Sequence, residues 1–385
     1  MRRHSGYAQV ALCRNPGRVL VVALGLGIAL ALTALAVLAN AALLAMAACA
    51  APAPERFTLK GDRIEICDLV GEVRLVRGSG PATEVIVTRG GRDAARLRIE
   101  TSYSGAGAGG QRAVLHVFYP ERRIVYPRLG GFSRSTFSVG RDGCLGSHER
   151  FSFLPRRVTV ASRGSGLEAW ADLEVRLPPG RDVTLHLGVG EVSASGIDDV
   201  VHLDVAAASV RAEDTRGSLY VDAGSGSVAL LRCEGDLVVD TGSGAVQLQD
   251  LKGGRLSVDT GSGQVTGGGI AADALVVDTG SGHIGLDRVG AREISLDTGS
   301  GAVRIGLERG PDRLVVDTGS GSVTIQGPAD LGAAVEIDTG SGGIESDFPL
   351  TLVHRGEGSL EGTIGDGRGR IRVDTGSGSV RLVRR

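Results

Sequence analysis

Residues 237–248 read L-V-V-D-T-G-S-G-A-V-Q-L, and their central D-T-G-S-G string decides the fold because it recurs along the chain. Neighbouring copies are 18 to 21 residues apart, and the final step is 36 residues. Self-similarity at a fixed period is typical of proteins built from stacked repeats. Identical copies begin at Asp240, Asp259, Asp278, Asp297, Asp317, Asp338 and Asp374, and a copy with one change begins at Asp222.

Each repeat predicts two short strands joined by a glycine-rich turn. Apolar side chains alternate with other residues on both sides of the turn, which indicates that one face of each strand is buried. The connections are too short for helical crossovers, so the units must stack in parallel on their neighbours. We therefore predict an all-β fold, a parallel β-solenoid of about eleven coils of 18–21 residues over 183–385. A degenerate repeat at 353–360 is expected to fill the final double step.

Stacking places the repeated aspartates in one column. Adjacent carboxylates ~5 Å apart repel each other by about 1 kcal/mol in water. We expect each aspartate to accept hydrogen bonds from its own turn, as in Asx-turns, while glycine supplies the tight corner. The alternative is a ladder that binds calcium. The predicted turn ladder comprises Asp222, Asp240, Asp259, Asp278, Asp297, Asp317, Asp338 and Asp374.

Charge and composition exclude some functions. The chain has 385 residues, with 42 Lys and Arg against 44 Asp and Glu, so it lacks the basic excess of a nucleic-acid-binding protein. Aromatic residues make up only 3%, which is low for an enzyme core of this size, whereas 61 glycines suit a repetitive β architecture. The composition favours a non-enzymatic protein without a cofactor.

The first 56 residues predict the location of the protein. Residues 1–18 form a basic leader without an acidic residue, and 19–48 contain no charged side chain. A membrane-spanning helix needs ~20 apolar residues, whereas the core of a secretory signal has only ~7–15. We therefore expect a single membrane helix at 19–48 with the leader in the cytoplasm. Residues 49–56 form an Ala/Pro tether to an extracytoplasmic remainder.

Two other fates of the leader remain open. Residues 46–49 read M-A-A-C, which resembles a bacterial lipobox and would make Cys49 a lipidation site. Cleavage after an A-x-A site at 45–47 would instead secrete the protein. All of these interpretations place residues 57–385 outside the cytoplasmic membrane.

Residues 57–182 differ from the repeats and contain most of the aromatic residues. We expect a β cap that closes one end of the solenoid, with an aromatic, glycine-rich insertion. The alternative is a loop that contacts a partner. Its candidate contact residues are Phe118, Tyr119, Tyr126, Phe132, Phe137 and Trp170.

The exported part contains three cysteines, Cys67, Cys144 and Cys233. Their spacing does not suggest a zinc site, so we predict no metal centre of this kind. An oxidising compartment permits a disulfide, and Cys67–Cys144 is the preferred pair, although three cysteines allow three pairings.

The string V-D-T-G-S at 239–243 looks like the signature of aspartic proteases. Those enzymes bring two carboxylates together in one cleft, where they share a proton. A motif that recurs on every coil would instead spread its acids along one edge. An aspartic-type hydrolase is therefore only a remote alternative.

The D-T-G-S-G-x-V repeats, the Gly71-Glu72-Val73 strand and the A-D-L-E-V-R-L-P-P-G segment at 171–180 resemble the bacterial putative-adhesin family of β-strand-repeat proteins. The resemblance covers residues 57–385 and implies a parallel β-solenoid on the cell envelope, with no catalytic residues. Some members are linked to envelope stress responses.

These observations favour a membrane-tethered β-solenoid that acts as an adhesin-like or envelope-scaffold binding protein, whose partner is an envelope protein or glycan. The alternative function is an envelope-stress sensor that presents or masks a membrane partner.

Overall fold

The computed structural model describes residues 53–105, 110–140, 143–145 and 156–385. The expected leader, membrane helix and lipidation site at Cys49 lie outside these residues. Within the described part of the chain, no helix is long and apolar enough to cross a membrane.

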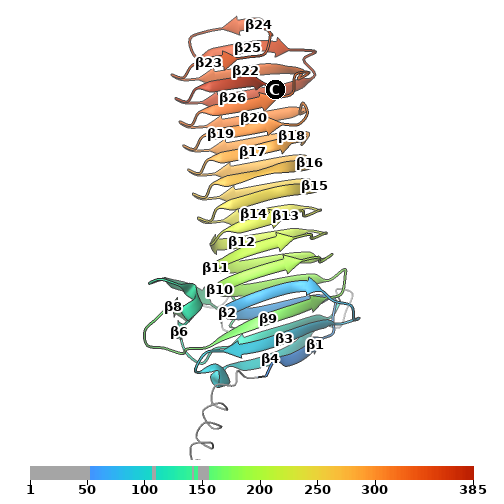
Figure 1. Cartoon of the computed structure of the whole chain (residues 1–385), viewed down its shortest axis with the longest axis vertical. Helices are drawn as coiled ribbons and strands as arrows, with labels where there is room; N and C mark the ends of the chain where they lie inside the picture. The colour runs from blue at the N-terminus through green and yellow to red at the C-terminus, as the bar shows by residue number, and fades with distance from the viewer. Residues whose placement is uncertain (1–52, 106–109, 141–142, 146–155) are drawn as a thin grey trace, which may run out of the picture. The chain divides into compact units, whose positions relative to one another are not determined.

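A stack of parallel coils forms most of the described chain (Figure 1). Most coils consist of two strands on either side of a turn, and each strand pairs in parallel with its counterpart in the next coil. The predicted parallel β-solenoid is therefore confirmed. Its strands are β2 (Arg63–Arg77), β10 (Asp182–Ser195), β11 (Val200–Glu213), β12 (Leu219–Ser225), β13 (Val228–Leu231), β14 (Leu237–Thr241), β15 (Val246–Thr260), β16 (Val265–Thr279), β17 (Ile284–Val289), β18 (Glu293–Thr298), β19 (Val303–Leu307), β20 (Arg313–Thr318), β21 (Val323–Gly327), β22 (Ala333–Thr339), β23 (Ile344–Ser346), β26 (Gly369–Thr375) and β27 (Val380–Arg384).

The core runs along the inside of the stack and follows the alternation in the sequence. In one coil, Leu237, Val239, Val246 and Leu248 point inward and are at most 2% exposed. Burying an aliphatic side chain of this size stabilises the fold by about 1.5–3 kcal/mol, but a single coil has no apolar surface of its own to pack against. Each coil therefore depends on its two neighbours.

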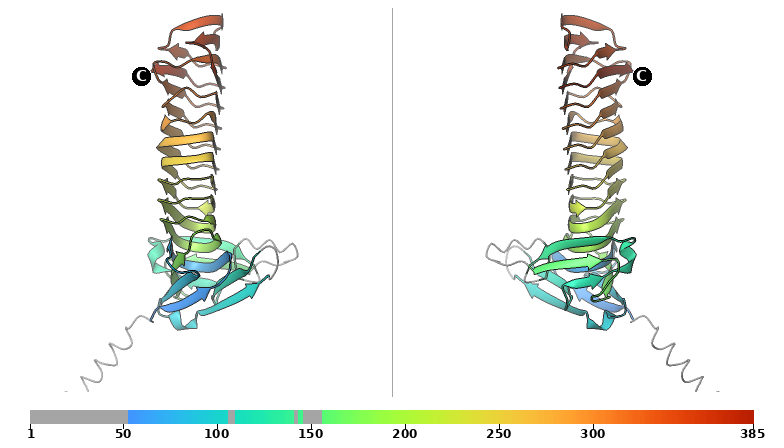
Figure 2. Two further views of the ribbon diagram at one scale, coloured as in Figure 1. Left: turned by 90° about the vertical axis from the view of Figure 1, so that its right-hand side faces the viewer. Right: turned by 90° about the vertical axis from the view of Figure 1, so that its left-hand side faces the viewer.

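The end of the stack nearer the N-terminus is closed by antiparallel strands. β5 and β9 both pair in parallel with β2, which forms the divergent first coil, and further strands then continue the sheet in antiparallel order. A separate three-stranded sheet and two 3-10 turns belong to the same region, which is broader than the stack of coils (Figure 2). These elements are β1 (Glu55–Leu59), β3 (Thr83–Gly90), β4 (Arg98–Ser104), β5 (Arg112–Phe118), β9 (Trp170–Leu177), then β6 (Arg123–Val125), β7 (Arg134–Val139) and β8 (Arg156–Ala161) of the small sheet, with η1 (Ala94–Arg96) and η2 (Pro127–Leu129).

The other end departs from the expected order of coils. Residues 353–360 do not form a degenerate coil, so that prediction is wrong. Instead β24 (Leu350–Arg355) and β25 (Ser359–Ile364) form an antiparallel hairpin that pairs with β22. A hairpin needs only a short turn, and it covers a sheet edge that another chain could otherwise pair with. The coil of β26 and β27 fills the position next to β22, between β22 and β20 (Figure 1).

Candidate functional site

The repeated aspartates form one exposed column, which we call the aspartate ladder. Strand pairing aligns each of them with the next at the coil spacing of ~4.8 Å. Their side chains point away from the core, on the outer face of the first strand of each coil. The ladder runs in the spatial order Asp222, Asp240, Asp259, Asp278, Asp297, Asp317, Asp374 and Asp338, and the half-buried Asp204 continues the column below Asp222.

Threonine, and not aspartate, caps the turns. In the described structure, none of the eight predicted ladder aspartates accepts a hydrogen bond from its turn, so the expected Asx-turns are wrong. The next residue, Thr260 for example, points inward, and its Oγ1 accepts a hydrogen bond from the Gly263 N–H at 3.1 Å. Thr279 Oγ1 in turn donates to the Gly263 carbonyl of the neighbouring coil at 3.0 Å. A buried threonine column therefore links the corners.

We expect Thr298→Val to lower the free energy of unfolding by about 1–3 kcal/mol. The substitution preserves the shape, but the Gly301 N–H and the Gly282 carbonyl, which lie 3.0 Å and 2.9 Å from Thr298 Oγ1, would lose their partner. Chemical denaturation and hydrogen exchange at Gly301 measure the effect. Ser300→Ala, at an exposed position of the same turn, is the matched control. Equal stability of the two variants would contradict the role of the threonine column.

Two aspartates of the ladder experience both partial burial and repulsion from their stacked neighbours. The pKa of Asp297 is raised, first by partial burial and then by the carboxylates of Asp278 and Asp317. The pKa of Asp222 is raised in the same way, with Asp204 and Asp240 as its neighbours. Within the described residues neither Asp222 nor Asp297 caps its turn or forms an ion pair, so these two side chains do not stabilise their corners. The calcium-binding alternative stays a prediction.

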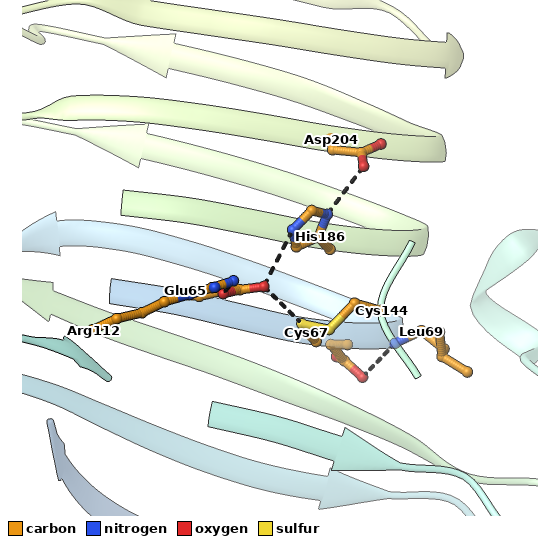
Figure 3. The surroundings of a disulfide bond; sticks show 8 residues. Glu65, Cys67, Leu69, Arg112, Cys144, His186 and Asp204 are labelled. Carbon is orange, nitrogen blue, oxygen red and sulfur yellow. Dashed lines mark hydrogen bonds and ion pairs between the residues drawn. A yellow bond between two sulfur atoms is a disulfide. The ribbon is translucent and has the colours of Figure 1, made fainter. Parts of the chain in front are cut away.

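At its lower end the ladder meets a disulfide (Figure 3). Asp204 Oδ2 lies 3.0 Å from Nδ1 of His186, which occupies the ladder position on β10, and Cys67 holds the same position on β2. Cys67 is bonded to Cys144, the pairing that the sequence analysis preferred. Glu65 lies beside both cysteines, but the two sulfur atoms are bonded to each other and so do not offer thiolate ligands to a metal.

A buried carboxyl group lies next to this disulfide, and the sequence analysis did not single it out. Asp68 is 1% exposed, and the Tyr119 hydroxyl lies 2.7 Å from its Oδ1. Burial raises the pKa of Asp68 to about 7, against the lowering effect of the hydrogen bond from Tyr119. Residues 64–70 read I-E-I-C-D-L-V, so the available signal was a pair of acids, Glu65 and Asp68, within an otherwise apolar run.

The aromatic residues belong mainly to the cap. Tyr119 and Tyr126 are 4% and 3% exposed, so the prediction that they contact a partner is wrong, because their rings pack in the core. Phe118, Phe137 and Trp170 are partly buried. Phe132 is 87% exposed, with the Arg163 guanidinium over one side of its ring, and is the most exposed of the six.

The fold and the ladder together define an all-β solenoid protein built from β-strand repeats. The chain belongs to the Toastrack DUF4097 family, whose model matches residues 171–383, more than half of the chain. The D-T-G-S-G-x-V string as a signature of that family stays a prediction.

The chain was also compared with solved structures and with curated proteins. A crystal structure of a putative cell adhesion protein from Clostridium sporogenes ATCC 15579 is similar at 10% identity, with a TM-score of 0.21. The similarity covers 86% of this chain and 100% of that one. No curated protein matches the sequence.

Proposed function

We propose that this chain is a non-catalytic, membrane-tethered, extracytoplasmic β-solenoid that binds an envelope protein or glycan through the aspartate ladder. The observation that carries the proposal is the division of roles within each D-T-G-S-G corner. Threonine caps the turn from inside, whereas the neighbouring aspartate is exposed and pays a repulsion of about 1 kcal/mol per close pair. Side chains that cost stability and serve no fold contact are best explained by an external partner.

The geometry of the ladder favours repeated contacts over catalysis. Each carboxylate is offset from the next by one coil, so the acids lie side by side on one face, as the pairing of Asp278 with Asp297 shows. An aspartic protease needs two carboxylates that face each other. A regular row of anions instead suits a partner with repeated cationic or hydrogen-bond-donating groups, because many weak contacts then add up.

The test compares binding of the full chain, purified in detergent, to isolated cell envelopes. The ladder variant carries Asp278→Asn, Asp297→Asn and Asp317→Asn. We expect its affinity to fall by about tenfold or more, since about 1.4 kcal/mol corresponds to a factor of ten. Removing like charges should not lower stability, so lost binding would not reflect unfolding. The control carries Asp273→Asn, Glu308→Gln and Asp330→Asn, which neutralise exposed acids outside the ladder.

Equal binding by the ladder variant and the control would contradict the proposal. Loss of binding only in Phe132→Ser would place the contact in the aromatic insertion instead. Peptide cleavage at acid pH that a single ladder Asp→Asn substitution abolishes would revive the hydrolase alternative. An unchanged affinity when calcium is removed is expected if the carboxylates contact the partner directly.

A further inference from the structure

The order of the coils in space differs from their order in the sequence. After the coil of β20 and β21, residues 328–332 lead to β22 and β23, but β22 does not pair with β20. β26 lies between them instead, with Arg370 opposite both Arg313 and Ala334. In the same way, β27 pairs with both β21 and β23. The coil that comes last in the sequence therefore fills a space between two earlier ones.

We call this space the slot, with β20 and β21 as one wall and β22 and β23 as the other. Toward the rest of the stack, β22 and β23 pair only with the inserted coil of residues 369–384. Without that coil, both walls would present unpaired backbone N–H and C=O groups. Such open edges readily pair with a strand from another chain.

Some contacts that the inserted coil makes in the slot could be made by any coil with a D-T-G-S-G turn. Ile371, Val373, Val380 and Leu382 of the inserted coil are at most 1% exposed, so they complete the core. Thr375 Oγ1 donates to the Gly321 carbonyl of the lower wall at 3.1 Å, which continues the threonine column.

Glycine is also required at the inserted corner. A Cβ atom on Gly378 would lie 1.8 Å from the Gly321 carbonyl oxygen, and one on Gly342 would lie 1.9 Å from that of Gly378. Only a coil with glycine at the position of Gly378 can therefore fill the slot, and the upper wall needs glycine at position 342 to lie against it.

Side chains add contacts that belong to this coil alone. Arg381 pairs with Glu345 of the upper wall at 2.7 Å. The Arg385 guanidinium donates a hydrogen bond to Gln326 Oε1 of β21 at 2.9 Å and forms an ion pair with Asp287 of β17. On its way to Asp287 the arginine passes Gly306, where a side chain would collide with it. These pairs distinguish residues 369–385 from the other coils, which share the backbone and threonine contacts.

We propose that the slot is an exchangeable binding site, which takes residues 369–385 of a second copy of this chain in place of its own and so joins two copies. The second copy is the fitting occupant because its segment has the same core residues, the same corner glycines and the same arginines. Exchange of an identical element between protomers costs little, since every contact of the closed monomer is formed again.

The connection to the inserted coil suits such an exchange. Residues 365–368 form a tight turn between β25 and β26, with Gly365 at φ 55° and Gly367 at φ 69°. Gly367 N–H donates to the Ile364 carbonyl at 3.2 Å and closes the turn. A short closed turn is the kind of hinge that opens when an element is swapped. Both walls precede the inserted coil in the sequence, so the slot is open until this segment enters.

The first experiment measures uptake of the segment in trans. A protease site is placed in the 365–368 turn of the full chain, and the turn is cut after folding. A fluorescent peptide of residues 366–385 is then added in excess. We expect it to replace the cut segment at one site per chain. A peptide with Val373→Asp and Leu382→Asp should bind at least about tenfold more weakly, because it would bury two carboxylates.

The second experiment tests the exchange between copies. The uncut full chain, warmed briefly at high concentration and cooled, should form a dimer in light scattering, and excess 366–385 peptide should suppress it. The proposal is overturned if the cut chain takes up no peptide, or if dimers are insensitive to the peptide. Equal binding of a peptide of residues 311–328 would show a slot open to any coil of this type and would contradict a site for this segment. Truncation at residue 365 gives a second route to an open slot if the cut chain unfolds.

Discussion

Replacing Gly263 with alanine is expected to force two coils apart and to lower the free energy of unfolding by about 4 kcal/mol. A Cβ atom at this corner would lie 1.9 Å from the Gly244 carbonyl oxygen and 2.8 Å from Thr260 Oγ1. Neither atom can move alone, because the carbonyl belongs to the neighbouring coil and the hydroxyl holds the turn through the Gly263 N–H. The coils must separate locally, and their threonine column must break.

Hydrogen exchange resolves this effect better than a global unfolding curve, since each coil is stabilised by its neighbours. Protection should fall in β14, β15 and β16 and remain in distant coils. Gly285→Ala is the matched control, because its nearest contact would be an ordinary one, 3.9 Å from Thr266 Cγ2. If Gly263→Ala keeps the protection of the control, the close corner contact does not limit the stack.

The solenoid could be predicted because its information is local. Alternation places Val239 inside, Asp240 outside and Thr241 inside, and the structure follows this parity. The same parity excluded aspartate as the inner cap of the corner. Aspartate was nevertheless expected to cap the corner, because Asx-turns are common in glycine-rich loops. Thr241 and not Asp240 caps the turn because its side chain points inward, and this direction matters more than the turn propensity of aspartate.

The order of the last coils could not be predicted, because it is not local. The coil that contains Asp374 has the same pattern as the one that contains Asp338, so either could pair with the coil of Asp317. The total free energy of all strand pairings decides between these two arrangements. The final step of 36 residues signalled an irregularity, but a hairpin and a degenerate coil explain that step equally well. The burial of Tyr119 likewise depends on a partner 51 residues away, Asp68.

The second large effect concerns Asp68, whose buried carboxyl group should make the cap less stable as the pH rises. Its pKa in the folded protein is about 7, against an ordinary value of 3.8. Between these values the folded state holds a proton that the unfolded state releases, so the contribution of Asp68 to stability is most favourable below pH 4 and declines up to pH 7. The decline approaches about 4 kcal/mol, at roughly 1.4 kcal/mol per pH unit.

The hydrogen bonds around Asp68 permit both protonation states. Above pH 7 the Tyr119 hydroxyl donates to the carboxylate at 2.7 Å. Below it, Asp68 donates to the Tyr119 oxygen, and the hydroxyl turns to the Val70 carbonyl at 2.9 Å. The Leu69 N–H donates to Oδ1 at 2.8 Å, whereas no group among the described residues hydrogen-bonds to Oδ2 to offset the burial of a charge, and Asp172 adds repulsion.

Asp68→Asn should abolish this pH dependence, because the amide stays neutral and fills the same space. Denaturant unfolding at pH 5 and pH 8, followed by the fluorescence of Trp170, the single tryptophan, reports on the cap directly. We expect the wild type to lose stability between these pH values and the variant to lose about 3 kcal/mol less. Asp273→Asn, at an exposed position outside the cap, should behave as the wild type. The same loss in wild type and Asp68→Asn would mean that the carboxyl group is already ionised at pH 5, and that the backbone N–H groups and Tyr119 compensate its burial in full.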